Sequence, residues 1–270
     1  MIFSFTKKNN NYKFDSSNGI DISIPLDFHG AQPRAYGVEK ASAKSYVSDN
    51  FIGDTRKGGS CNFEKYTLIP HCNGTHTECI GHITDERIFI NEALKDSLVP
   101  STLITLKPVN ALDSKDSYLA GKEKNDLLME KKSLIALSKQ DKDFLYGLIV
   151  RTLPNDESKK SRDYIMEPPP FFSTEAMEFI SSFGINHLLV DIPSVDKADD
   201  KGQLSTHHIF WDVPHSIHKV DVKNHSLRTI TEMVYIPDNV KDGNYLLNLQ
   251  IASFMADASP SRPVIFEIKF

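Results

Sequence analysis

The sequence predicts one α/β domain that spans residues 1–270. Three observations support this prediction. Short runs of apolar and β-branched residues recur along the chain, each bounded by proline, glycine or charged residues, which is typical of strands. One amphipathic helix is followed directly by a buried strand, as in an αβ unit packed on a sheet. No internal repeat and no proline- or glycine-rich linker divides the chain.

The strands are predicted in chain order. Residues 21–26 alternate polar and apolar side chains, as a short strand does. Residues 30–59 are irregular and rich in glycine, which predicts a long loop, and loops of that length are usually functional. Further strands are expected where apolar runs recur, at residues 62–69, 101–106, 146–153, 187–192, 220–236, 245–254 and 263–270.

One helix is clearly predicted, from Ser173 to Gly184. Ser173 can cap its N-terminus, and Gly184 can end it. The polar residues 114–142 are expected as helical segments or as an excursion on the surface, and residues 155–163 as a charged loop. Apolar side chains of the helix follow the i, i+3, i+4, i+7 spacing of one buried stripe, at Ala176, Phe179, Ile180 and Phe183.

Composition limits the classes of function. Hydrophobic residues make up 40% and charged residues 25% of the chain, as in an average globular protein, and the formal net charge is -5. Basic residues are interspersed with acids, as in Lys122-Glu123-Lys124, which is typical of a solvated surface. Binding to nucleic acid requires a concentrated basic face, so nucleic acid is not an expected partner.

The cellular address expected from the sequence is the cytoplasm. The apolar run at residues 1–5 is too short for a signal-peptide core, and no run approaches the ~20 apolar residues of a membrane helix. The three cysteines contain no CxxC pair, so neither a disulfide framework nor a zinc knuckle is predicted.

A cluster of histidines predicts a metal site at His71, His76, Glu78 and His82. His76 and Glu78 are two residues apart, so on an extended backbone their side chains point the same way. Gly74 allows a tight turn between the first two histidines. Imidazole and carboxylate are the ligands that zinc and similar divalent metals prefer. The alternative is a group of unrelated polar residues at the end of a strand.

A second group of candidates lies farther along the chain, at His207, His208 and Glu232. Glu232 interrupts an apolar run, so it is either a buried functional carboxylate or a residue on the solvent side of a half-exposed strand. Three other histidines lie in a polar connection and are expected at the surface: His215, His218 and His225.

At these residues the sequence resembles the cyclase family of metal-dependent hydrolases, which includes bacterial kynurenine formamidases and isatin hydrolases. The family signature His-x-Gly-Thr-His-x-Asp-x-Pro-x-His is similar to residues 71–82. Four further family motifs are matched in the family's order, and their joint occurrence is more specific than any one of them. They lie at residues 21–26, 191–196, 207–232 and 257–262.

The resemblance implies a fold, an assembly and a metal. The fold would be an α/β domain of the swivelling β/β/α type, with a mixed sheet and flanking helices, assembled as a homodimer or homotetramer. The metal would be divalent, zinc or manganese, with His71, His76 and Glu78 as ligands.

The resemblance also implies catalytic roles. His82 would be the general base or a ligand of a second metal. His207, or its neighbour His208, would complete the pocket together with Glu232, as catalytic residues or as further ligands. The implied reaction is hydrolysis of a C–N amide bond, in a formamide or cyclic amide of a small molecule, by metal-activated water with a histidine base.

Two departures from the signature leave alternatives open. Asn73 is one extra residue between the first histidine and the Gly-Thr-His, so Cys72 is an alternative to His71 at the first ligand position. Glu78 replaces the aspartate of the family. The two departures either compensate for each other or mark a site that has lapsed.

Other functions remain open on the sequence. Lactone hydrolysis, dehydration or cyclisation would use the same metal and base, and a non-catalytic relative would bind metal or ligand alone. A cysteine hydrolase is less favoured, because Cys72 and Cys79 have no basic partner beyond the histidines already assigned.

Overall fold

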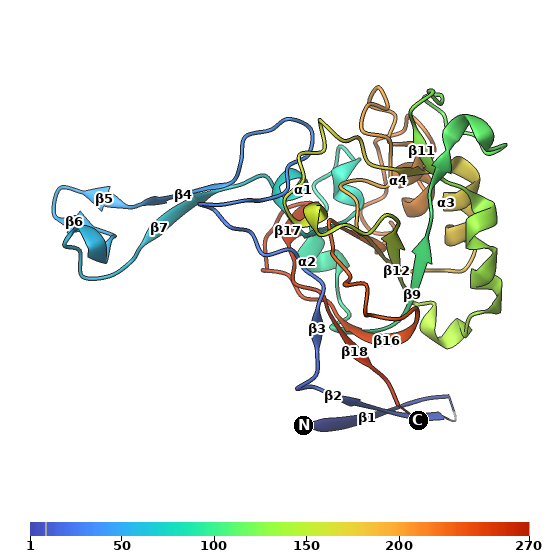
Figure 1. The fold of residues 1–270 in the computed structure, drawn as a ribbon, viewed down its shortest axis with the longest axis horizontal. Helices are drawn as coiled ribbons and strands as arrows, with labels where there is room; N and C mark the ends of the chain where they lie inside the picture. Colours follow the sequence, from blue (N-terminus) through green and yellow to red (C-terminus); the bar gives the residue numbers. More distant parts are fainter. Residues whose placement is uncertain (9, 270) are drawn as a thin grey trace.

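A mixed sheet of nine strands forms the centre of the computed structural model, which describes residues 1–8 and 10–269 (Figure 1). The strand order is β17-β8-β15-β14-β12-β9-β16-β18-β3. The four central strands run parallel, and the strands towards both edges pair antiparallel. The predicted α/β fold with a mixed sheet is confirmed.

The bounds of the sheet strands agree best with the predictions at the centre: the predicted strand 101–106 lies within β9, and β12 lies within the predicted strand 146–153. The predicted strands at 21–26 and 220–236 are each shorter in the structure, and Phe270 lies outside the described residues. The strands are β3 (Ile20–Asp21), β8 (His76–Glu78), β9 (Leu98–Leu106), β12 (Gly147–Thr152), β14 (His187–Val190), β15 (Thr229–Glu232), β16 (Gly243–Asn248), β17 (Ala258–Pro260) and β18 (Val264–Glu267).

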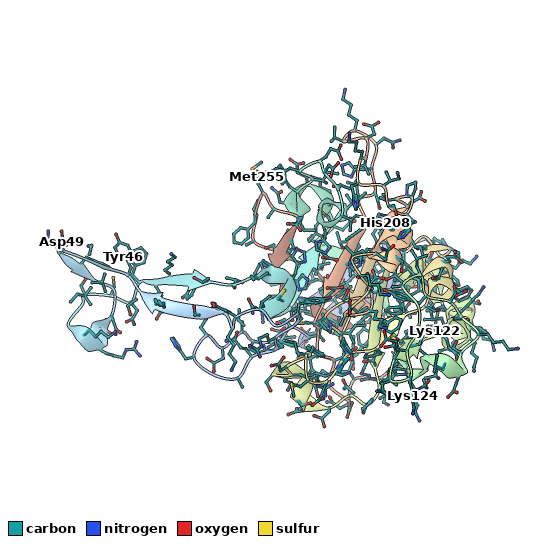
Figure 2. All side chains as sticks on the ribbon, turned by 90° about the horizontal axis from the view of Figure 1, so that it is seen from above. Tyr46, Asp49, Lys122, Lys124, His208 and Met255 are labelled. Atoms are coloured by element: carbon teal, nitrogen blue, oxygen red, sulfur yellow. The ribbon has the colours of Figure 1, made fainter. Side chains whose placement is uncertain are left out.

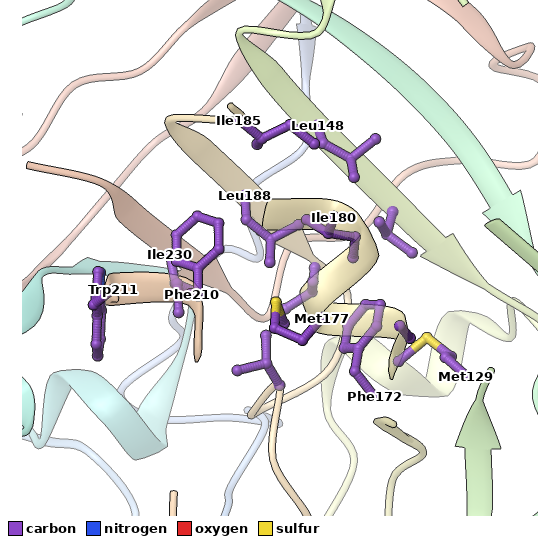
Figure 3. Packing of buried hydrophobic residues seen from close by; sticks show 14 of the residues in the cluster. Met129, Leu148, Phe172, Met177, Ile180, Ile185, Leu188, Phe210, Trp211 and Ile230 are labelled. Atoms are coloured by element: carbon purple, nitrogen blue, oxygen red, sulfur yellow. The ribbon is translucent and has the colours of Figure 1, made fainter. Parts of the chain in front are cut away.

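Two helices, α3 (Thr174–Ser181) and α4 (Ser205–Trp211), cover one face of the sheet. The predicted cap of α3 is confirmed, because Ser173 Oγ accepts the N–H of Ala176 at 2.9 Å, a contact worth ~1 kcal/mol. No sequence pattern predicted α4. The core beneath the two helices is fully buried and includes Phe172, Met177, Ile180, Leu188, Phe210 and Ile230 (Figure 3).

The opposite face of the sheet buries a second apolar cluster, which includes Leu103, Ile149, Leu189 and Leu247. Because both faces of the central strands are covered, these strands are apolar rather than alternating. A small sheet of β10 (Val109–Asn110), β11 (Leu127–Met129) and β13 (Phe171–Phe172) lies beside α3, and the short helices α1 (Pro70–Asn73) and α2 (Ile90–Ala93) precede strands of the main sheet.

Several polar segments form single turns of 3-10 helix, and residues 131–139 form a longer one. Lys122 and Lys124 lie on the surface of the body, as predicted (Figure 2). The charged segment 155–163 is not wholly exposed, because Lys159 is buried and its Nζ lies 2.7 Å from Asp191 Oδ2. Within the described ranges, no helix has the length and apolar character needed to cross a membrane.

Two hairpins project from the body (Figure 1). One is formed by β1 (Ile2–Lys7) and β2 (Asn10–Asp15). The other, here called the arm, comprises residues 42–67 and pairs β4 (Ser42–Ser45) with β7 (Glu64–Thr67), with β5 (Val47–Ser48) and β6 (Phe51–Ile52) at its tip. The prediction of a loop over residues 30–59 is therefore wrong for the arm, and residues 62–69 do not join the main sheet.

Candidate metal centre

Two of the candidate ligands and one candidate catalytic acid come from neighbouring strands of the main sheet. His76 on β8 lies directly opposite Glu232 on β15, and Glu78 is two residues farther along the same strand. All three side chains therefore point to one face. The residues between them, Thr77 and Thr231, point to the other face and join through their hydroxyls at 2.8 Å. The interpretation of Glu232 as half-exposed is wrong, because it is buried.

Two more histidines reach this face from short helical turns. Pro70 begins α1, which carries His71, and a 3-10 turn over residues 80–82 carries His82. His71 Nδ1 lies 3.0 Å from Glu78 Oε2, and its Nε2 lies 2.9 Å from Asp257 Oδ2. The same Asp257 oxygen is 3.4 Å from His82 Nδ1. One carboxylate thus orients two imidazoles.

His207 enters the cluster from α4. Its Nδ1 lies 2.6 Å from Asp196 Oδ2, and its Nε2 lies 3.0 Å from Glu78 Oε1. Asp196 also accepts the backbone N–H groups of Thr206 and His207 at the start of α4. The same carboxylate therefore caps the helix and holds the ring of the histidine.

His208 does not join the cluster. Successive residues of an α-helix point about 100° apart, because a turn takes 3.6 residues. His208 Nδ1 instead lies 3.3 Å from the carbonyl oxygen of Val213, and its ring lies 5.4 Å from that of His215 and 5.9 Å from that of His218. Its position on the body is marked in Figure 2. Of the two neighbouring candidates, the structure brings in His207 alone.

Two buried polar atoms at the centre of the cluster, His76 Nε2 and Glu78 Oε2, form no hydrogen bond among the described residues, although Glu232 Oε2 lies 3.4 Å from the first and His71 Nδ1 lies 3.0 Å from the second. A buried polar atom without a hydrogen bond costs up to ~1–3 kcal/mol, and the ionic contacts reduce this cost. A divalent cation between them would satisfy both. Candidate ligand atoms within 4.8 Å of one another form three overlapping groups: His71–His76–Glu78, His71–His82–Asp257 and Glu78–His82–His207.

The nitrogen and oxygen donors of these groups fit a divalent transition metal such as zinc or manganese. Cys72 belongs to none of them, and burial raises the pKa of its thiol to about 11. His71 rather than Cys72 is therefore brought to the first ligand position. The extra residue Asn73 is accommodated as the last residue of α1.

The pKa values of the two buried glutamates are shifted in opposite directions. Burial by itself raises the pKa of Glu78, but the neighbouring His82 and His207 outweigh burial and hold this pKa well below the ordinary range. Burial raises the pKa of Glu232, and the negative charge of Glu78 raises it further. His76 Nε2 lies 3.4 Å from Glu232 Oε2 and opposes that rise. The pKa of Glu78 thus favours the anion, whereas the pKa of Glu232 favours the protonated form.

Two histidines of the cluster, His71 and His207, have raised pKa values when no metal is bound. Burial by itself lowers the pKa of His71, but hydrogen bonds to Asp257 and Glu78 raise it to about 10. Hydrogen bonds to Asp196 and Glu78 likewise raise the pKa of His207. A metal must displace these protons, so its binding is coupled to pH.

Two site residues were not assigned roles from the sequence, Asp196 and Asp257. Both lie in stretches that resemble family motifs, residues 191–196 and 257–262, and that resemblance was the available signal. Asp257 immediately precedes β17, whose Ala258 lies opposite Glu78. The antiparallel pairing of β17 with β8 therefore places Asp257 beside the ligands.

The fold and this cluster define an α/β protein with a buried candidate metal centre of histidine and carboxylate. The chain belongs to the cyclase family: the family model described as "Putative cyclase" matches residues 20–197. It is 28% identical over 257 residues to a kynurenine formamidase of Bacillus cytotoxicus, covering 93% of this chain and 98% of the relative. It is 30% identical over 256 residues to that of Bacillus anthracis, with the same coverage.

Solved structures share the fold. A predicted metal-dependent hydrolase from Bacillus stearothermophilus superposes with a TM-score of 0.59 at 15% identity, covering 92% of this chain and 98% of the other. An isatin hydrolase bound to the product analogue thioisatinate superposes with a TM-score of 0.60 at 14% identity, covering 93% of each chain. The fold expected from the family resemblance is confirmed.

Proposed function

We propose that this chain is a metal-dependent hydrolase that cleaves the C–N bond of a small-molecule formamide, in the manner of an arylformamidase. One observation carries the proposal: two buried ligand atoms that form no hydrogen bond among the described residues, His76 Nε2 and Glu78 Oε2, lie within a cluster of histidines and carboxylates. The relatives that match nearly the whole chain are named kynurenine formamidases.

His71, His76 and Glu78 would hold the metal, as zinc or manganese. Two imidazoles and one carboxylate leave open positions, as in catalytic rather than structural sites. Such a metal, when bound, supplies Lewis-acid activation of water and of the amide carbonyl. Glu78 also contacts His207, with 3.0 Å between Oε1 and Nε2, and this contact orients its carboxylate.

His82 is the favoured general base. Its side chain is 27% exposed, so a substrate can reach it, and Asp257 lies 3.4 Å from its Nδ1. This contact orients the ring and leaves Nε2 to take a proton from water. His207 is less suited to proton exchange with substrate, because Asp196 and Glu78 hold both of its nitrogens and it is buried.

Glu232 is the favoured proton donor to the leaving amine. Its raised pKa keeps a proton available, and the backbone N–H of Val195 fixes Oε1 at 3.1 Å. A carboxyl group beside a second carboxylate is a recurrent way to obtain an acid near neutral pH. His207 Nε2 lies 3.8 Å from Glu232 Oε1 and can help to orient it.

The test is formate release by purified chain supplied with zinc or manganese. N-formylkynurenine and formanilide are the substrates, and an aryl lactone of similar size is the comparison. We expect formate release that a chelator abolishes and added metal restores. Metal uptake without hydrolysis of any formamide would contradict the proposal, and faster hydrolysis of the lactone would favour the alternative chemistry at the same site.

We also propose that the chain assembles as a homodimer or homotetramer through the arm. Aromatic side chains at its tip are half exposed, at 48% for Tyr46 and 54% for Phe63. Figure 2 shows Tyr46 and Asp49 far from the body. Exposed apolar patches of this kind mark interaction sites.

A further inference from the structure

The pairing of β8 with β15 ends at the candidate metal centre. The last pair joins His76 to Glu232, and the same register would next place Thr75 opposite Met233. Met233 departs from the extended conformation at this point, because its φ is +53°, in the left-handed region. A residue with a long side chain rarely adopts this region, so the surrounding structure must hold it there.

Hydrogen bonds on both sides of Met233 hold this turn. The N–H of Met233 donates to the carbonyl oxygen of Ile192 at 3.0 Å. The carbonyl oxygen of Met233 accepts a hydrogen bond from the hydroxyl of Thr75. A side-chain hydroxyl thus joins the two chains where the left-handed turn ends the pairing of their backbones.

Thr75 also accepts two hydrogen bonds from segments far away in sequence. The backbone N–H of Ile24 donates to Thr75 Oγ1 at 2.8 Å, and the backbone N–H of Ser261 donates to the carbonyl oxygen of Thr75 at 3.1 Å. Both donors lie in stretches that resemble family motifs, near the two ends of the chain. Thr75 therefore connects the histidine signature to two other motifs and to the residue that follows Glu232.

The two residues beside these contacts belong to the candidate metal centre. Glu232 directly precedes Met233, and His76 directly follows Thr75. His76 Nδ1 donates to the carbonyl oxygen of Gly74 at 3.0 Å, on the other side of Thr75. This hydrogen bond leaves Nε2 of the ring with its lone pair, 3.4 Å from Glu232 Oε2.

We propose that Thr75 is a positioning residue: its hydroxyl holds the backbone after Glu232 against the backbone before His76. The proton donor and the metal ligand thereby keep their separation. This inference rests on the proposed function, which gives those roles to the two residues. Displacing a catalytic group by about 1 Å costs about 10²-fold in rate, and losing a contact that orients a ligand costs about 10–100-fold in metal affinity.

The first test compares Thr75→Val with Thr75→Ser, both loaded with zinc. Valine keeps the shape of threonine but cannot form hydrogen bonds through its side chain, whereas serine keeps the hydroxyl. We expect kcat for formate release to fall about 10²-fold in Thr75→Val, with KM within about threefold of wild type, because the proton donor acts in the transition state. Thr75→Ser should stay within about threefold in kcat. Equal losses in the two variants, or wild-type kcat in Thr75→Val, would overturn the proposal.

Thr102→Val is the matched control. Thr102 is also buried, and its hydroxyl also donates to a backbone carbonyl, that of Phe144 at 3.0 Å. It lies on β9, which β12 and β14 separate from β15. Both valine variants leave a buried carbonyl without its donor, so both should melt a few degrees below wild type. A fall in kcat as large in Thr102→Val as in Thr75→Val would assign the effect to lost stability and overturn the proposal.

The second test does not depend on turnover. Zinc affinity is measured by competition with a chelator. We expect Thr75→Val to bind zinc about tenfold more weakly, and Thr75→Ser and Thr102→Val to bind it as wild type does. Wild-type affinity in Thr75→Val would overturn the role of Thr75 in placing His76. If the wild type binds zinc but hydrolyses no formamide, the proposed function fails, while this comparison still decides the role of Thr75.

The third test measures hydrogen exchange in the metal-free chain, so it needs neither metal nor substrate. In Thr75→Val the backbone N–H of Ile24 loses its acceptor, so this amide should exchange about tenfold faster than in wild type or in Thr102→Val. Unchanged exchange would overturn the contact on which the proposal rests. Faster exchange together with wild-type kcat and zinc affinity would assign Thr75 to the fold alone.

Discussion

The candidate metal centre and the arm are built in contrasting ways. At the centre, strands of three or four residues and single helical turns are held by partners far away in sequence, such as His71 with Asp257 and Glu78 with His207. In the arm, β4 pairs with β7 through a hairpin, and its aromatic rings contact one another, with Tyr46 and Phe63 5.4 Å apart.

The difference lies in burial and charge. The centre holds ionisable groups out of water, where each unpaired atom is costly and each charge changes its neighbours. The arm exposes apolar rings, and some of its charged residues pair with one another, as Arg56 does with Asp54 at 2.8 Å. We therefore expect substitutions at the centre to change metal binding and turnover, and changes in the arm to affect assembly while leaving the metal centre intact.

The largest effect is expected for His76→Ala. This change removes a buried ligand and leaves Glu78 and Glu232 close together without a cation. We expect loss of bound metal and a fall in kcat/KM of about 10³-fold or more. Elemental analysis and formate release measure the two quantities. His225→Ala, a half-buried histidine outside the cluster, is the control, and retained metal in His76→Ala would contradict the ligand assignment.

A smaller effect is expected for His82→Ala, which should keep the metal but lose about 10²–10⁴-fold in kcat, the usual contribution of a general base. Asp257→Asn should lose about 10–100-fold, because it weakens the orientation of the ring. Kinetics at saturating metal provide the comparison. If His82→Ala also loses the metal, His82 is a ligand, and a two-metal centre replaces the single-metal assignment.

The stability of the metal-free chain should depend on pH through His71. Its pKa rises from 6.5 to about 10 on folding, so its stabilising contribution is complete below about pH 6.5 and is lost as the pH rises through 10. The melting temperature should therefore fall over this window, while metal affinity should rise as protons leave the ligands. A His71→Gln chain should lose much of this slope. A melting temperature of the wild type that rises with pH would contradict the assignment.

The smallest effect on the metal centre is expected from shortening the arm. Ser45 and Glu64 are paired residues, so an Asn-Gly turn can join them and replace residues 46–63. We expect metal affinity to stay within about twofold of wild type, as for changes away from a site. The mass measured by light scattering should fall to that of a monomer. If the mass does not change, the arm does not form the interface of the assembly.

Parts of the centre could be predicted from local pattern. The spacing of His76 and Glu78 on an extended backbone determines that both side chains share one face, and β8 confirms it. Ser173 caps α3 as predicted, because a cap depends on residues within one turn. The apolar runs of β9 and β12 were recognisable for the same reason: burial on both faces leaves a continuous signal.

Other parts required contacts that no local pattern contains. Adjacent histidines at 207 and 208 differ only in the direction in which α4 presents them, and α4 itself had no clear sequence signal. Residues 42–59 of the arm were predicted as part of a loop, because their short strands are polar or exposed and are interrupted by glycine. Neither the helical nor the strand period of apolar residues is visible there.

The sequence by itself determined the class of chemistry, since His71, His76, Glu78 and His82 offer metal ligands at a spacing that one short segment can present. Only the tertiary structure decided which distant groups complete the centre. Antiparallel pairing sets Glu232 opposite His76 and brings Asp257 beside Glu78, and Asp196 turns His207 inward. The physical reason is the distance along the sequence over which each feature is determined. The direction of side chains within one element follows from the local backbone period. The contact between two elements follows from strand register and burial across the whole chain.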